Sequence, residues 1–343
     1  MGKKLGLIIQ YIIFLGGGIF LVWWQFSKMT PLEYKDFKYA LYNADYRVLI
    51  PIIFIAVSIF ISRAMRWRIM IAPMGYTPSF FNTFGATMTG FLANTFLPRI
   101  GEILKCTILG KYEKIPVQKL IGTVVVERIF DLLCYLVLIL FTFFIQYKLV
   151  GSFIKDTFNK FINNTGQPLW MTGVLIFVIL TAVIFILRFV FKKYAGGKIA
   201  IKIKIFLAGL KEGFSSILKL QKKGWFLFHT GYIWSMYLLQ VYIGFSAFAD
   251  LNHLGFNAAC AVLTLATFAN IITPGGLGAF PTAIFLILSL YDINQTTGEA
   301  FGWLMWGVTT FIILFFGLLF LGLLYFNNRK RQPDEVLYKS VTK

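Results

Sequence analysis

Apolar segments long enough to cross a lipid bilayer recur along the whole chain and alternate with short polar connections. A spanning helix needs about 20 predominantly apolar residues. Segments of this kind lie at 6–24, 47–65, 119–145, 169–191, 225–249 and 301–326. Because a helix satisfies its own backbone hydrogen bonds inside lipid, the pattern predicts an all-α polytopic membrane protein with about six spanning helices.

Two further apolar stretches, 79–110 and 256–290, are interrupted near their centres by proline and glycine. They share the motif Ala-Asn-x-x-x-Pro, in Ala93–Pro98 and again in Ala269–Pro274. Paired, interrupted segments in two halves of a membrane protein indicate an inverted repeat around a central binding site. Proline ends a helix because it lacks the amide donor and its ring clashes with the preceding turn. We therefore predict one helical hairpin at each stretch, with breaks at Pro98, Gly101, Pro274, Gly275, Gly276 and Gly278.

Basic residues in the short connections predict how the chain is threaded, since Lys and Arg are enriched in cytoplasmic loops. Lys3 and Lys4 place the N-terminus inside, and segment 192–223 carries nine lysines against Glu212 alone. The connections on both sides of the first hairpin are basic, whereas those around the second contain neither Lys nor Arg. We therefore predict two re-entrant hairpins of opposite orientation, the first opening inward and the second outward, with their proline-containing tips meeting near the middle of the membrane, and two cytoplasmic termini.

These assignments predict a single integral membrane domain over residues 1–327 and a cytoplasmic tail at 328–343. Its two half-repeats, about 5–145 and 169–326, have opposite orientation. Apolar residues interleaved with the lysines predict an amphipathic helix at about 199–223 on the inner leaflet, with a solvated helical linker as the alternative.

Composition supports this class of protein and narrows its partners. Hydrophobic residues make up 58% of the 343 residues and charged residues 14%, and the mean hydropathy is +0.75, unlike a soluble domain. The net charge of +19 lies in the connections, which predicts contact with anionic membrane lipids rather than nucleic acid. We expect the protein to lie in the cytoplasmic membrane. We expect no metal or cofactor, because Cys106, Cys134 and Cys260 lack metal-type spacing. The sequence leaves open whether the chain forms a homo-oligomer.

Ionisable residues inside apolar segments are costly and are functional candidates. Segment 119–145 contains Glu127, Arg128 and Asp131, whose spacing places them on one helical face. The first hairpin adds Asn94, Arg99, Glu102 and Lys105 around its break. We expect Glu127 or Asp131 to pair with Arg99 or Arg128, which leaves a cation for a phosphate or carboxylate. A closed ion-pair network that fixes the hairpin to its neighbours is the alternative.

The second hairpin and one helix end supply further candidates. The turn at 274–278 could offer backbone donors to an anion, or its glycines could simply permit a tight turn. Asn270 lies just before it and is a candidate for substrate contact. Arg63 and Arg66, with Trp67 next to them, are expected at a cytoplasmic helix end, as topology anchors or as sites that recruit lipid head groups.

Four ordered motifs resemble a known family. They are Arg63-x-x-Arg66-Trp67, Gly90-x-x-x-Asn94-x-x-x-Pro98-Arg99-x-Gly101-Glu102, Glu127-Arg128-x-x-Asp131 and Pro274-Gly275-Gly276-Leu277-Gly278. Over about residues 10–325 the chain resembles the lysylphosphatidylglycerol synthase transmembrane region, a flippase-like membrane domain. In two-domain synthases this region is taken to move aminoacylated phosphatidylglycerol across the membrane, while a soluble domain makes that lipid. The present sequence has no segment resembling the soluble domain, and it has Phe280 and Pro281 where the family often has Arg-Glu.

The leading hypothesis is therefore a lipid flippase rather than an enzyme. Arg99, Arg128 and Lys105 would contact the head group, while Glu102, Glu127 and Asp131 would orient these cations or take up a coupling proton. A secondary transporter of a small anionic solute would use the same inverted repeat and buried charges. A membrane-embedded transferase acting on a polyprenyl phosphate ranks last, because it calls for an acidic metal site.

Overall fold

In the part of the chain that the structure describes, all regular secondary structure is helical. The structure is a computed structural model, and it describes residues 16, 18–97, 100–147 and 220–329. Residues 18–27 are helical, and the longer helices that follow are α2 (Pro31–Tyr42), α3 (Leu49–Ile71), α4 (Phe80–Phe96), α5 (Ile100–Glu113), α6 (Val117–Ile145), α10 (Lys223–Phe245), α11 (Phe256–Ile272), α12 (Ala279–Leu288) and α13 (Gln295–Arg329). Short 3₁₀ turns join them: η1 (Tyr46–Val48), η2 (Ala72–Met74), η3 (Ala249–Leu251), η4 (Pro274–Gly276) and η5 (Ser289–Tyr291). The prediction of an all-α membrane protein is confirmed.

Three helical segments in the described ranges are long and apolar enough to cross a membrane. They are Tyr46–Met74, Val117–Ile145 and Gln295–Arg329, and they coincide with three of the predicted spans. Helix α10 covers much of a fourth, 225–249. The predicted helix 169–191 and most of the amphipathic helix 199–223 lie outside the described residues, so the number of crossings stays a prediction.

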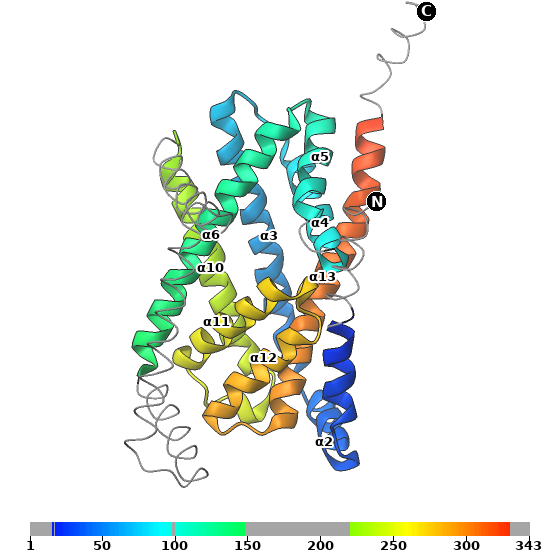
Figure 1. Ribbon diagram of the computed structural model, residues 1–343, viewed down its shortest axis with the longest axis vertical. Coiled ribbons are helices and arrows are strands. Elements are labelled where there is room, and N and C mark those ends of the chain that lie inside the picture. Colours follow the sequence, from blue (N-terminus) through cyan, green and yellow to red (C-terminus); the bar gives the residue numbers. More distant parts are fainter. Residues whose placement is uncertain (1–15, 17, 98–99, 148–219, 330–343) are drawn as a thin grey trace, which may run out of the picture.

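Each interrupted stretch forms two helices that pack against each other, α4 with α5 and α11 with α12. Figure 1 shows the first pair in the upper half of the molecule and the second in the lower half. Both α4 and α11 contain 17 residues. Asn94 stands two residues before the end of α4, and Asn270 stands two residues before the end of α11. The repeated motif therefore occupies the same place in two helices of equal length.

The two helices also end in the same way, because the residue before a proline disfavours the helical conformation. Leu97 follows α4 with φ −134° and ψ 97°, and its N–H donates to Ala93 O at 2.8 Å. Thr273 follows α11 with φ −123° and ψ 146°, and its N–H donates to Ala269 O at 3.1 Å. Pro274 then opens η4, whereas Pro98 lies outside the described residues.

The tips of the two hairpins meet. Turn η4 packs against α4, and a Cβ atom added to Gly275 would lie 3.3 Å from Thr95 Cα. From α13, the Trp306 indole N–H donates to Gly275 O at 2.8 Å and fixes the second tip from another side. The contact between the tips agrees with the predicted arrangement, while the position of the tips within a membrane stays a prediction.

A network of polar side chains holds the opposite, open end of the first hairpin. Glu113, the last residue of α5, accepts hydrogen bonds from Ser79 N–H at 3.1 Å, Ser79 Oγ at 2.7 Å and Asn82 Nδ2 at 2.6 Å. Asn82 and Asn328 of α13 exchange hydrogen bonds at 2.9 and 3.2 Å. This end of the hairpin is therefore tied both to itself and to the last helix.

One connection has helical structure of its own, and one helix is longer than expected. The connection 26–46 contains helix α2. A capping box begins this helix: Thr30 Oγ1 accepts from Glu33 N–H at 3.2 Å, and the Glu33 carboxylate accepts from Thr30 N–H at 2.7 Å. Helix α3, expected to end at residue 65, continues to Ile71, so the arginines expected at its end lie inside it.

Candidate functional site

Ionisable side chains from three helices converge on one cluster in the described structure. Helix α3 supplies two arginines, α5 a glutamate and a lysine, and α6 two acids and an arginine. These residues, hereafter the charged cluster, are Arg63, Arg66, Glu102, Lys105, Glu127, Arg128 and Asp131. Spacings of three and four residues place the members from each helix on one face.

Glu127 lies at the centre of the charged cluster. Its side chain is 2% exposed, and its carboxylate accepts from Arg66 Nη2 at 3.1 Å, Lys105 Nζ at 3.0 Å and Arg128 Nη2 at 2.9 Å. The Arg63 guanidinium lies 3.6 Å away. A buried carboxylate is tolerated only where cations and donors surround it, and four cations meet that requirement here.

Asp131 lies one turn further along α6 and shares the three arginines. Its carboxylate lies 2.7 Å from Arg66 Nη1, 3.4 Å from Arg63 Nη1 and 3.5 Å from Arg128 Nη2. The arginines therefore bridge the two acids, which gives a connected network rather than separate ion pairs.

Neighbouring side chains hold the cations in place. Arg63 Nε donates to Tyr237 Oη at 3.2 Å, and Arg66 Nη1 donates to Thr230 Oγ1 at 3.3 Å, both from α10. Lys105 Nζ lies 4.4 Å from the centre of the Trp67 ring, a cation–π contact. Sequence reasoning predicted this helix but gave it no part in the site, although Thr230 and Tyr237 are seven residues apart and so share one helical face.

The charged cluster has an excess of positive charge and one open edge. Among the described residues it contains four cations and three carboxylates, and one of those carboxylates, Glu102, pairs there with Arg128 alone, at 3.5 Å. The Glu102 and Arg128 side chains are 32% and 39% exposed, whereas Arg66 is fully buried. A pocket of about 20 Å³ adjoins this edge, large enough for about one water molecule. It is lined by Thr87, Gly90, Phe91, Asn94, Gly101, Glu102, Lys105 and Arg128.

A close approach of two glycines positions α5, and with it Lys105 and Glu102. A Cβ atom on Gly101 would overlap the Gly90 carbonyl oxygen and lie 2.8 Å from the Asn94 side chain. Asn94 Oδ1 accepts from Gly101 N–H at 2.9 Å and so satisfies an otherwise unpaired amide in the first turn of α5. Asn94 therefore lines the pocket and also caps a helix.

The structure brings most of the predicted site residues together, with one correction. Arg63 and Arg66, expected at an exposed helix end, are buried because α3 continues past them and two acids of α6 neutralise them. Arg99, expected to contact a head group, lies outside the described residues. The expected pairing of Arg128 with Glu127 and Asp131 is present.

The candidate residues on the second hairpin are uncharged, unlike those of the charged cluster. Gly275, Gly276 and Gly278 have φ values of 59°, 71° and 72°, a region that residues with a Cβ atom rarely adopt. The Asn270 carboxamide lies against Gly276, leaving no space for a side chain there. The backbone thus accounts for the glycines, and anion binding at this turn stays a prediction.

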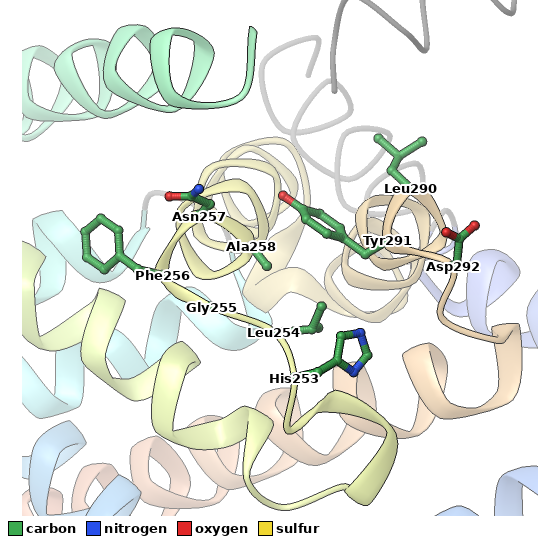
Figure 2. A pocket seen from close by; sticks show the side chains of 9 residues that line it. All are labelled: His253, Leu254, Gly255, Phe256, Asn257, Ala258, Leu290, Tyr291 and Asp292. Carbon is green, nitrogen blue, oxygen red and sulfur yellow. The ribbon is translucent and has the colours of Figure 1, made fainter. Parts of the chain in front are cut away.

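A second, wider pocket lies at the other end of the molecule. It is an open cup of about 570 Å³ between the start of α11 and the segment after α12, and Figure 2 shows its side chains. His253 and Asp292 are its acid–base side chains besides Tyr291, and both are exposed. None of the predicted site residues line it. Within the described ranges, no three His, Cys, Asp or Glu side chains gather closely enough to hold a metal ion.

Apolar helices of spanning length around a buried ionic network define an integral membrane protein that crosses the bilayer more than once. The chain belongs to the lysylphosphatidylglycerol synthase TM region family, whose model matches residues 7–331. It is also similar to the UPF0104 membrane protein MJ1595 of Methanocaldococcus jannaschii, with 27% identity over 277 residues, which cover 75% of this chain and 78% of that protein. No solved structure matches it.

Proposed function

We propose that the protein is a lipid flippase that moves an anionic head group across the cytoplasmic membrane through the charged cluster. The observation that carries the proposal is the excess cation at the open edge of a buried ionic network. The excess charge lies at Arg128, whose side chain is 39% exposed, so an anion can reach it from outside the network and form charge-assisted hydrogen bonds with it. Family membership supports a lipid-related role.

In this proposal Arg128 is the residue that meets the head group first. It is the more exposed partner in its contacts with Glu127 and Asp131, and its guanidinium can bind two phosphate oxygens at once. Lys105, also on the wall of the adjoining pocket, adds a second positive charge. Glu127 holds both cations in place and keeps them from repelling each other.

The paired hairpins supply the route. Two 17-residue helices with the same motif and the same end geometry support an inverted repeat, the architecture of transporters that open to each side in turn. With six crossings and both termini cytoplasmic, the first hairpin opens inward and the second outward. The head group would pass where the two tips meet, while its acyl chains stay in the bilayer.

A transport assay in reconstituted vesicles tests this function. Vesicles carrying labelled phosphatidylglycerol or labelled phosphatidylcholine report how fast each lipid changes leaflet, against vesicles without protein. Arg128→Gln should slow phosphatidylglycerol movement about 10–100-fold, the loss expected for a charge-assisted hydrogen bond worth about 1.5–3 kcal/mol. Lys111→Gln is the matched control, since Lys111 is an exposed cation on α5 outside the charged cluster.

Two results would overturn the proposal. One is wild-type lipid movement in a folded Arg128→Gln protein. The other is uptake of a small phosphate or carboxylate solute by vesicles in which labelled lipid does not move, which would identify an anionic solute transporter instead.

A further inference from the structure

Glu299 is a deeply buried acid that the proposed transport site does not use. It lies in the second turn of α13 and is 1% exposed. Its Oε1 accepts a hydrogen bond from Gln295 Nε2 at 2.9 Å, whereas Oε2 is buried and has no hydrogen-bond partner among the described residues. No salt bridge within those residues involves Glu299. This contrasts with Glu127, which four cations surround.

A second buried polar group lies beside this acid. The Gln25 side chain is 5% exposed and interacts with the Glu299 carboxyl group. In the described structure neither Oε1 nor Nε2 of Gln25 has a hydrogen-bond partner of good geometry. An amide offers one acceptor and one donor group, so the unpaired atoms on both side chains can satisfy each other in two ways.

The charged neighbour that acts on Glu299 is an acid, whereas Lys28 and, on α2, the charged side chains of Lys35, Asp36 and Lys38 are exposed. From α2 it feels the like charge of Glu33, and from η3 the Asp250 carboxylate binds the nearby Thr297 hydroxyl at 3.0 Å. Residues 18–27 and α12 contain no ionisable side chain. The other ionisable residues of α13, Tyr325 and Arg329, lie at its far end.

The helices that face α13 from α3 and α10 add no cation near this acid. On α3, Arg63 and Arg66 are paired with acids in the charged cluster. On α10, Lys223 and His229 lie in the first two turns of the helix. A buried carboxylate with only like charges nearby is expensive. Protonation removes that cost.

We propose that Glu299 is a reversible proton-binding site that couples the movement of the second hairpin to a proton. Taking up a proton from water forms the Oε2–H bond, and that hydroxyl donates to Gln25 Oε1. Releasing the proton to water restores the carboxylate, and a rotated Gln25 amide donates to it through Nε2. Both states therefore have a partner within the same pair of side chains, and no other reactant is needed.

The packing of α12 explains how movement of the hairpin controls this acid. A Cβ atom on Gly302 would lie 2.7 Å from Pro281 Cα, and one on Gly298 would lie 3.4 Å from Phe285 Cα. These glycines, on either side of Glu299 in sequence, let α12 lie flush against α13, as the contact between the two helices in Figure 1 shows. A hairpin displaced from α13 admits water to the carboxyl group. The coupling rests on the proposed transport function, but the proton site itself does not.

Infrared spectroscopy tests the proton site without any transport. Wild-type protein in vesicles at neutral pH should show the C=O stretching band of a protonated carboxylic acid, and Glu299→Gln should lose it. Gln25→Leu keeps the acid but removes its amide partner, so it should shift the band. Asp36→Asn removes an exposed acid of α2 and should leave the band unchanged. A wild type without the band, or a band that survives in Glu299→Gln, overturns the proposal.

A pH gradient then tests the coupling. With one proton per lipid, a gradient of about one pH unit sustains a lipid ratio of about ten between leaflets, because one unit equals about 1.4 kcal/mol. We expect this accumulation in wild type and Asp36→Asn and its loss in Glu299→Gln. Lipid that moves in wild type without responding to the gradient refutes the coupling and leaves the flippase intact. Lipid that does not move at all, with the infrared band present, refutes the proposed function and leaves the proton site intact.

Discussion

Neutralising Glu127 is the sharpest probe of the charged cluster. Glu127→Gln keeps the shape of the side chain and removes the negative charge that contacts Arg66, Lys105 and Arg128 at 2.9–3.1 Å. Asp131 still neutralises the arginines, but it has no contact with Lys105. That lysine is 7% exposed and becomes a buried cation without a counter-ion.

The expected loss is large. Removing one partner of a buried ion pair costs about 3–5 kcal/mol, because the other charge stays buried and unpaired. At about 2 °C per kcal/mol, the value for larger chains, the apparent Tm should fall by about 6–10 °C. Lys105→Met alone should cost about 1–3 kcal/mol, since three arginines still surround Glu127.

The double variant decides whether this reasoning is correct. Adding Lys105→Met to Glu127→Gln removes the unpaired cation, so the double variant should be more stable than Glu127→Gln alone. The proteins are purified in the same detergent and heated to a series of temperatures. The measurement is the fraction of folded protein that size-exclusion chromatography recovers after each temperature. If Lys105→Met lowers the apparent Tm equally in both backgrounds, the charges are not coupled and the argument from the buried network fails.

Three further predictions concern local structure. Gly101→Ala should destabilise the first hairpin by more than about 3 kcal/mol, because backbone and not a flexible side chain opposes the new Cβ atom; Gly122→Ala, on an open face of α6, should change thermal stability by less than about 1 kcal/mol. Asn328→Leu should cost about 1–3 kcal/mol in the same unfolding assay, since its buried partner on α4, Asn82, loses two hydrogen bonds, and an unchanged Tm contradicts the pairing. The Thr30 backbone N–H and hydroxyl lower the pKa of Glu33, so its capping contribution is complete above the ordinary pKa and is lost as pH falls through the lowered one. Hydrogen exchange in α2, corrected for intrinsic rates, should therefore quicken in acid in the wild type and be insensitive to pH in Glu33→Gln.

The hairpins could be predicted from the sequence because their causes are local. A proline restricts its own backbone and that of the preceding residue, so the ends of α4 and α11 follow from Pro98 and Pro274 alone. Loop charges added the expectation that the two tips face each other, and the contact of Gly275 with Thr95 agrees with it. The start of α2 was also within reach, since Thr30 and Glu33 have the spacing of a capping box.

The composition of the charged cluster was only partly predictable. The spacing of three of its members on one helix, Glu127, Arg128 and Asp131, predicts that they lie together. The burial of Arg63 and Arg66 depends on which helices pack beside α3, and this long-range property cannot be read from the local sequence. Basic residues near the end of an apolar segment look like an exposed cytoplasmic helix end. The contribution of Tyr237 has the same origin, because an aromatic residue in an apolar helix looks like any lipid-facing or core residue until its partner is known.

The contact of Gly90 with Gly101 has a mechanical consequence. Two arms that touch backbone to backbone, and that a side-chain cap joins, cannot slide or bend apart without losing that contact. We therefore expect the two helices of the first hairpin to move together as one rigid unit. A displacement of its tip would then also move its base, where Glu113 and Asn82 link it to the last helix.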